Sequence, residues 1–227
     1  MGLLPKKEMQ RLKAEKRKAK EDKKRKVAVR NVAVSFLIVC EGEKTEPQYF
    51  TSLIKDRVSR VREVDIQGEG RGTVSLVKQA LSLVEKSSTE YDRVWVVFDK
   101  DDFEDFNQAI TLANSKKIHC AWSNEAFELW YYLHFQYLDT GINRDEYCKK
   151  LEREIKRCTG DSSYKYKKGD KETYRLLKQY GNEQLAIKYA KRLKSNCRGR
   201  DYESHKPCTM VYKLVEELNN PEILLNS

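Results

Sequence analysis

Apolar runs of strand length are spaced along the first half of the chain. The clearest are SFLIVC at residues 35–40 and VWVVFD at residues 94–99. Their continuous apolar character is typical of strands that are buried on both faces of a sheet. Residues 61–67 alternate apolar and polar positions, and residues 118–122 form a shorter apolar run. We therefore expect four strands here.

Amphipathic stretches of helix length separate these runs. The first begins at Thr45, a residue type that caps helices, with Pro47 in the first turn. Two more cover residues 73–86 and 103–114. Strands that alternate with helices of this length predict a parallel sheet with helices on both faces. The fold class is therefore α/β.

The second half of the chain has a different pattern, and no further strand is predicted after Asn124. The apolar stretch NEAFELWYYLHF, at residues 124–135, is expected to be a helix. Further helical patterns follow at residues 144–157, 171–180, 183–195 and 209–218. We predict a basic tail over residues 1–30, an α/β core over 31–124 and a helical part over 125–227 that packs on the core.

The charge is concentrated in the tail. Residues 1–30 hold 13 Lys and Arg against 4 Asp and Glu, and so carry +9 of the formal net charge of +10. The rest of the chain is close to neutral. A basic tail favours polyanions, so contact with nucleic acid phosphate is one interpretation. A solubilising segment and a segment that docks a partner are the other two.

Six cysteines occur without any C-x-x-C pair, which indicates reduced thiols and a cytoplasmic protein. A zinc site formed by Cys197, His205 and Cys208 would match no common ligand spacing. The basic N-terminus is not followed by the apolar segment of a signal peptide, and no apolar run is long enough to span a bilayer. We expect no membrane association.

Acidic residues follow two of the predicted core strands. The first strand is followed by Glu41 and Glu43, and the third ends at Asp99 and is followed by Asp101. Ligands of parallel sheets bind outside the carboxyl ends of the strands, so these side chains should share one edge of the sheet. Clustered carboxylates repel one another, and a cation offsets that cost. Mg²⁺ is the natural candidate because it prefers carboxylate oxygens and keeps waters for substrate phosphates.

These acidic strand ends resemble a known signature. LIVCEGEKTEPQYF (residues 37–50) together with VWVVFDKDDF (residues 94–103) resembles the Toprim pattern, a Glu-Gly after the first strand and an Asp-x-Asp after the third. With SNEAFELWYYLHF (residues 123–135) and KPCTMVYKLVEEL (residues 206–218), the chain is similar to the RloB family of bacterial proteins. The resemblance runs from about Phe36 to the C-terminus.

The resemblance implies a Toprim-like core in which Glu41, Asp99 and Asp101 hold Mg²⁺ or Mn²⁺ and take part in catalysis. Toprim enzymes cut or join phosphodiesters, and RloB-like proteins are associated with phage defence or abortive infection, commonly beside an ATPase. This chain contains no Walker A sequence, so an ATPase activity would come from a partner protein.

Other residues near the predicted site have two interpretations each. Lys44 could contact a substrate phosphate and assist catalysis, or be a surface residue. Ser123 and Asn124 could cap the next helix, bind substrate, or do both. Glu128 could face the site as a catalytic acid, or stabilise a helix N-terminus. The remaining acids that could complete a two-metal site are Glu43, Glu46, Asp102 and Glu128.

Lys165 and Lys167, interleaved with Tyr164 and Tyr166, offer charge and aromatic surface to single-stranded nucleic acid, or form a polar loop. His134 is interpreted as a semi-buried histidine with satisfied hydrogen bonds and not as a general base.

Two functions remain open. The first is a metal-dependent nuclease that acts on DNA or RNA, tRNA included. The second is a non-catalytic effector that binds metal or nucleotide and docks onto an ATPase. A homo-oligomer is compatible with either.

Overall fold

The computed structural model describes residues 15–18, 34–57, 61–68, 72–100 and 104–225. Of the predicted tail, only residues 15–18 fall within this part, and they are helical. The interpretations of the rest of residues 1–30 lie outside the described residues.

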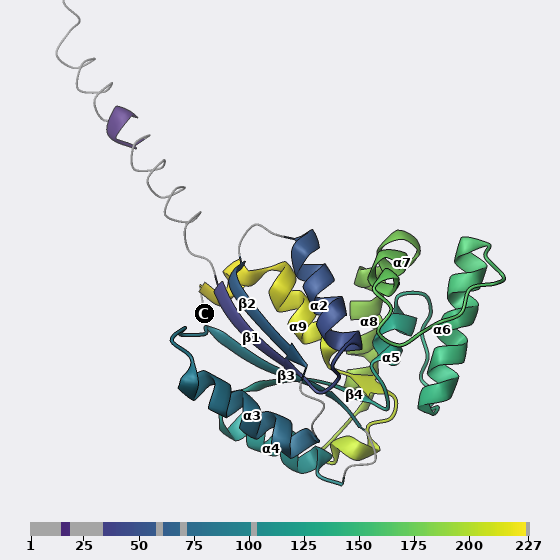
Figure 1. The fold of residues 1–227 in the computed structure, drawn as a ribbon, viewed down its shortest axis with the longest axis horizontal. Coiled ribbons are helices and arrows are strands. Elements are labelled where there is room, and N and C mark those ends of the chain that lie inside the picture. Colours follow the sequence, from purple (N-terminus) through teal and green to yellow (C-terminus); the bar gives the residue numbers. More distant parts are fainter. Residues whose placement is uncertain (1–14, 19–33, 58–60, 69–71, 101–103, 226–227) are drawn as a thin grey trace, which may run out of the picture.

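The described part of the chain contains one mixed sheet of five strands in the order β2-β1-β3-β4-β5 (Figure 1). The strands are β1 (Val34–Cys40), β2 (Val61–Gly68), β3 (Arg93–Asp99), β4 (His119–Asn124) and β5 (Cys208–Thr209). The first four are parallel, as predicted. β5 is antiparallel to β4, so the prediction that no strand follows Asn124 was wrong. A two-residue strand has no periodicity by which its sequence could be recognised.

Helices cover both faces of the sheet, which confirms the predicted α/β class. Figure 1 shows α3 and α4 on one face, and α2 and α9 on the other. The helices are α2 (Thr45–Asp56), α3 (Thr73–Lys86), α4 (Phe106–Ser115), α5 (Glu128–Leu133), α6 (Arg144–Thr159), α7 (Glu172–Tyr180), α8 (Glu183–Asn196) and α9 (Val211–Asn219). Helices α5 to α8 extend the molecule beyond the sheet, on the side where β4 lies (Figure 1).

The core is centred on β1, in which all seven residues are buried. This strand lies between β2 and β3 and packs helices on both faces, which explains its unbroken apolar sequence. Each large apolar side chain buried here stabilises the fold by roughly 1.5–3 kcal/mol. The helical part is attached to this core, since β5 joins the sheet and the Trp95 indole donates to Glu217 of α9 at 3.0 Å.

Two predicted helix starts differ from the structure. Lys44, and not Thr45, is the N-cap of α2, and no side chain caps it. The apolar helix predicted for residues 124–135 is shorter, because α5 spans only Glu128–Leu133 and its N-cap is Phe127. All six residues of α5 are buried, so tertiary packing maintains a helix too short to be stable alone.

No helix in the described ranges has both the length and the apolar character needed to cross a membrane.

His134 ends α5 as a buried histidine, 5% exposed, in agreement with its interpretation from the sequence. Its Nδ1 lies 3.0 Å from the carbonyl oxygen of Trp130. Burial lowers its pKa from 6.5 to about 4, because the charged imidazolium would lose its hydration. His134 is therefore neutral near pH 7.

We predict that His134 makes unfolding pH-dependent. Its pKa is lower in the folded state, so the unfolded chain takes up the proton first as pH falls. The stabilisation is complete above about pH 6.5 and is lost as pH falls toward about 4. The loss amounts to roughly 3 kcal/mol. Urea titrations across this window should give a flatter slope of unfolding free energy against pH for His134→Leu, and a smaller change for His119→Gln, at a more exposed residue. Equal slopes for wild type and His134→Leu would contradict the prediction.

Candidate functional site

The order of the strands places a topological switch point at the carboxyl ends of β1 and β3, where open α/β sheets have their ligand crevice. These two strands are neighbours, yet α2 leaves β1 for one face of the sheet while α4 leaves β3 for the other (Figure 1). Open α/β sheets bind their ligands at such a switch point. Glu41 directly follows β1, and Asp99 is the last residue of β3.

Backbone hydrogen bonds hold these two strand ends together. The Asp99 N–H donates to Oε2 of Glu41 at 3.1 Å, and the Glu41 N–H donates to the Val97 carbonyl at 2.8 Å. The structure therefore brings together two of the three acids predicted to hold metal. The third, Asp101, lies outside the described residues, as does Asp102.

The Asp99 carboxylate is largely buried, with 13% of its side chain exposed. Its Oδ2 accepts the Phe127 N–H at 3.1 Å and lies 3.9 Å from Arg144. Its Oδ1 is buried and has no hydrogen-bond partner within the described ranges. Burial raises the pKa of Asp99 well above its usual value, and the charges of Glu46 and Glu128 raise it further.

Glu46 joins the same cluster from the first turn of α2. It is 6% exposed, so it is not the solvated first-turn acid that its position suggests. Its Oε2 is buried and also lacks a partner among the described residues. Burial raises its pKa from 4.5 to about 7, with a further contribution from Glu128. A Cβ at Gly42 would overlap this carboxylate, so the glycine leaves the space in which Glu46 lies.

Glu128 completes the cluster from α5 and is 1% exposed. Its Oε1 accepts the Tyr166 hydroxyl at 2.9 Å and lies 3.8 Å from Nζ of Lys168. We call Glu41, Glu46, Asp99 and Glu128 the carboxylate cluster. The remaining candidate acid, Glu43, is exposed at the rim of the crevice and is not part of this cluster.

Cationic side chains approach the carboxylate cluster from the helical part. Arg144, at the first position of α6, reaches Asp99, although a cation there opposes the helix dipole. Lys168 belongs to residues 160–171, the segment between α6 and α7, which we call the lysine loop. Lys44 lies beside this loop, since a Cβ at Gly169 would meet its side chain.

The lysines and the tyrosines of the lysine loop differ in their exposure to solvent. Lys165 and Lys167 are exposed, and Lys165 forms an ion pair with Glu152 at 3.4 Å. Tyr164 and Tyr166 are instead partly buried and pack against the core. The part of each ring that packs against the core fastens the loop, and only the remainder could offer a stacking surface.

Ser123 and Asn124 also serve the fold and neither caps α5 nor reaches the crevice. Ser123 is fully buried, and its Oγ shares a 2.9 Å hydrogen bond with Thr209 of β5. Asn124 is 2% exposed and donates from Nδ2 to the Glu203 carbonyl at 2.8 Å. The two polar side chains are thus used within the fold, Ser123 by β5 and Asn124 by residues 202–204.

Comparison with known families decides the relationship of the chain. The RloB-like protein family matches residues 36–218. The chain belongs to the RloB-like family. The comparisons with curated proteins and with solved structures gave no match.

The carboxylate cluster of this RloB-like protein offers carboxylate oxygens, the ligand type that Mg²⁺ prefers. No group of three or more His, Cys, Asp or Glu side chains in the described ranges is arranged to hold a metal. Mg²⁺, however, often binds through only one or two carboxylates and keeps several waters. Oδ1 of Asp99 and Oε2 of Glu46 are two such oxygens that are buried and have no hydrogen-bond partner among the described residues.

Sequence reasoning did not single out Arg144 of this RloB-like site, and it named Glu46 only as one of four acids that could complete a two-metal site. For Glu46 the signal was Gly42, which removes a side chain four residues earlier in the chain. For Arg144 the signal was an arginine directly after Asn143, the capping residue of α6, where a cation is unfavourable for an isolated helix.

We predict that Glu46→Gln stabilises the protein in EDTA. The pKa of Glu46 is higher in the folded state, so stability falls as pH rises from about 4.5 to about 7, and the cost is complete above that range. Glutamine removes up to about 3 kcal/mol of this cost. Urea unfolding above pH 7 should reveal the gain. Mg²⁺ should then stabilise the wild type more than the variant.

Glu85→Gln, at an exposed position, is the matched control and should change stability by less than about 0.5 kcal/mol. A Glu46→Gln protein that is less stable than wild type in EDTA would show that the carboxylate is satisfied without a cation.

Proposed function

We propose that this RloB-like protein is a divalent-metal-dependent nuclease with a Toprim-like core. The observation that carries the proposal is the pair of buried, partnerless carboxylate oxygens of Asp99 and Glu46 at the β1/β3 switch point of the described sheet. A protein retains such an uncompensated charge where function requires it, because burial without a partner costs stability.

Mg²⁺ or Mn²⁺ would be held by Asp99 and Glu46, with Glu41 and Asp101 as the further ligands expected from the resemblance. When bound, the ion would polarise a phosphodiester and make a water molecule more acidic. A nearby cation lowers the pKa of a carboxyl group, so Glu46 would be ionised in the loaded protein. We therefore assign Glu46 to metal binding and not to proton transfer.

The other groups of the site act on the substrate or on the cluster. Arg144 and Lys168 border the carboxylates and are partly exposed, so they can contact a phosphate that approaches the crevice. Lys44, exposed beside the lysine loop, can do the same. Glu128 is a positioning residue, because its Oε1 is occupied by Tyr166 and faces Lys168.

The substrate in this proposal is RNA, tRNA included, or DNA. Lys165 and Lys167 extend the cationic surface from the crevice to solvent, and the basic residues 1–30 add further charge for a polyanion. A role in phage defence beside an ATPase partner stays a prediction that follows from the family resemblance. A cytoplasmic location and self-association likewise stay predictions from the sequence.

We predict that Asp99→Asn abolishes cleavage while the protein remains folded. Purified protein should cut labelled RNA or DNA pools with Mg²⁺ or Mn²⁺ and not with EDTA. The variant should lose at least about a hundredfold in rate. Asp139→Asn, at an exposed position, is the matched control and should cut like wild type.

Cleavage that persists in Asp99→Asn would reject the site. Calorimetric Mg²⁺ binding by wild type without cleavage, with or without an ATPase partner, would favour the non-catalytic effector.

We predict that the lysine loop contributes to the electrostatic binding of nucleic acid. The double variant Lys165→Gln, Lys167→Gln should bind single strands more weakly. The slope of log affinity against log salt should fall by about 0.7 for each lost phosphate contact. Fluorescence anisotropy at several salt concentrations measures both effects.

The control pair, Lys86→Gln and Lys116→Gln, removes exposed lysines at the C-terminal ends of α3 and α4, at the opposite edge of the sheet. Equal slopes for the two double variants would exclude the loop from binding.

A further inference from the structure

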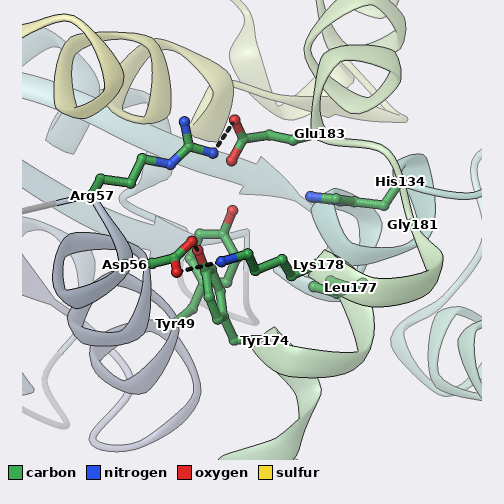
Figure 2. A pocket seen from close by; sticks show the side chains of 9 residues that line it. All are labelled: Tyr49, Asp56, Arg57, His134, Tyr174, Leu177, Lys178, Gly181 and Glu183. Atoms are coloured by element: carbon green, nitrogen blue, oxygen red, sulfur yellow. Dashed lines mark hydrogen bonds and ion pairs between the residues drawn. The ribbon is translucent and has the colours of Figure 1, made fainter.

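A pocket of about 180 Å³ lies between α2, α5, α7 and the start of α8, away from the carboxylate cluster (Figure 2). Its lining from α2 is Tyr49, one turn after Glu46, and Asp56 and Arg57 at the end of the helix. No member of the carboxylate cluster lines it. The pocket is therefore distinct from the proposed catalytic site, and a ligand bound in it would serve a role beyond the proposed nuclease activity.

The charged groups of this pocket compensate one another. Arg57 pairs with Glu183 at 2.9 Å, and Lys178 pairs with Asp56 (Figure 2). Tyr174 also donates from its hydroxyl to Asp56 at 3.2 Å. A charged ligand would have to break one of these pairs, so the pocket favours an uncharged one.

His134 presents a hydrogen-bond acceptor to the pocket. Its Nδ1 lies against the Trp130 carbonyl, which can only accept, so Nδ1 carries the proton. The ring is neutral near pH 7 because burial lowers its pKa to about 4. The Nε2 lone pair is therefore available, and Figure 2 shows the ring directed into the pocket.

Tyr49 presents a hydrogen-bond donor. The residue is 2% exposed, and its hydroxyl donates no hydrogen bond within the described part of the chain. The neighbouring indole of Trp130 can only donate, so it offers no acceptor for the hydroxyl proton. Figure 2 shows this hydroxyl directed between the two ion pairs. A buried polar group without a partner costs stability, and a ligand acceptor would remove that cost.

The size and shape of the pocket further limit which ligands fit. The pocket is smaller than the roughly 300–1,000 Å³ of sites for drug-sized molecules, so it fits about one or two rings. Its walls include the ring of Tyr174, which packs edge-on against Tyr49 with centroids 5.6 Å apart. Aromatic walls favour a flat ring.

We propose that this pocket binds an uncharged nucleobase, which donates an N–H to Nε2 of His134 and accepts the Tyr49 hydroxyl. Nucleobases carry such a donor next to an acceptor on one edge. The base can belong to a free nucleoside or to a nucleic acid strand, since the recognised edge is the same in both.

The test is calorimetric titration of the full chain in EDTA, so that its outcome is independent of metal and of cleavage. The four ribonucleosides form one arm and short single-stranded oligonucleotides form the other. Tyr49→Phe removes only the unsatisfied hydroxyl and should weaken binding about three- to tenfold. Circular dichroism should show that the variant is folded, and the loss of binding without loss of fold separates this role from a purely structural one. Tyr132→Phe is the matched control, because that hydroxyl contacts Gln136, 3.5 Å away.

A second measurement uses ¹⁵N-labelled histidine, of which the chain has only three. The Nε2 resonance of His134 should move upfield when the base binds. Nucleoside binding would identify a free ligand, and binding of oligonucleotides alone would identify a base in a strand. The proposal is overturned if neither arm binds, if Tyr49→Phe binds like wild type, or if binding leaves the His134 resonance unchanged.

Discussion

Negative charge buried between the ends of β1 and β3 is the constraint on which this structure depends. Asp99 and Glu46 come from a strand end and a helix start, and the pKa of each is raised by burial and by neighbouring carboxylates. The backbone does not relieve this repulsion. The backbone instead fixes the carboxyl groups close together, because the Asp99 N–H is hydrogen-bonded to Glu41 and Gly42 leaves room for Glu46. The protein thus holds like charges together at a geometric position where parallel sheets bind ligands.

The helical part supplies the side chains that surround this cluster. Its first helix, α5, contributes one more acid, Glu128, and the next segments contribute the cations Arg144 and Lys168. These cations lie 3.9 and 3.8 Å from their carboxylates, so they moderate the negative potential without neutralising it. Tyr166 fastens the lysine loop to Glu128, and the loop thereby borders the crevice. An acidic centre framed by cations suits a phosphodiester that must approach a metal, which is the basis of the proposed function.

The sequence was sufficient for the parts of the fold that depend on periodicity. β1 and β3 were evident because they are buried on both faces, and α3 was placed at its observed bounds. Glu41 and Asp99 could be brought together because strand ends share an edge. The burial of Glu46 could not be read from its own neighbourhood, since it depends on α5, about eighty residues further along the chain. Ser123 was misjudged for a related reason, because its partner Thr209 is 86 residues away.

β5 also ties the site to the order in which the polypeptide is made. The Lys100 N–H beside Asp99 donates to the Ser123 carbonyl, and Ser123 in turn shares its hydroxyl with Thr209. A ribosome-bound chain therefore cannot complete the β4 edge until synthesis has passed Thr209. Contacts over such separations form late because closing a long loop has an entropic cost.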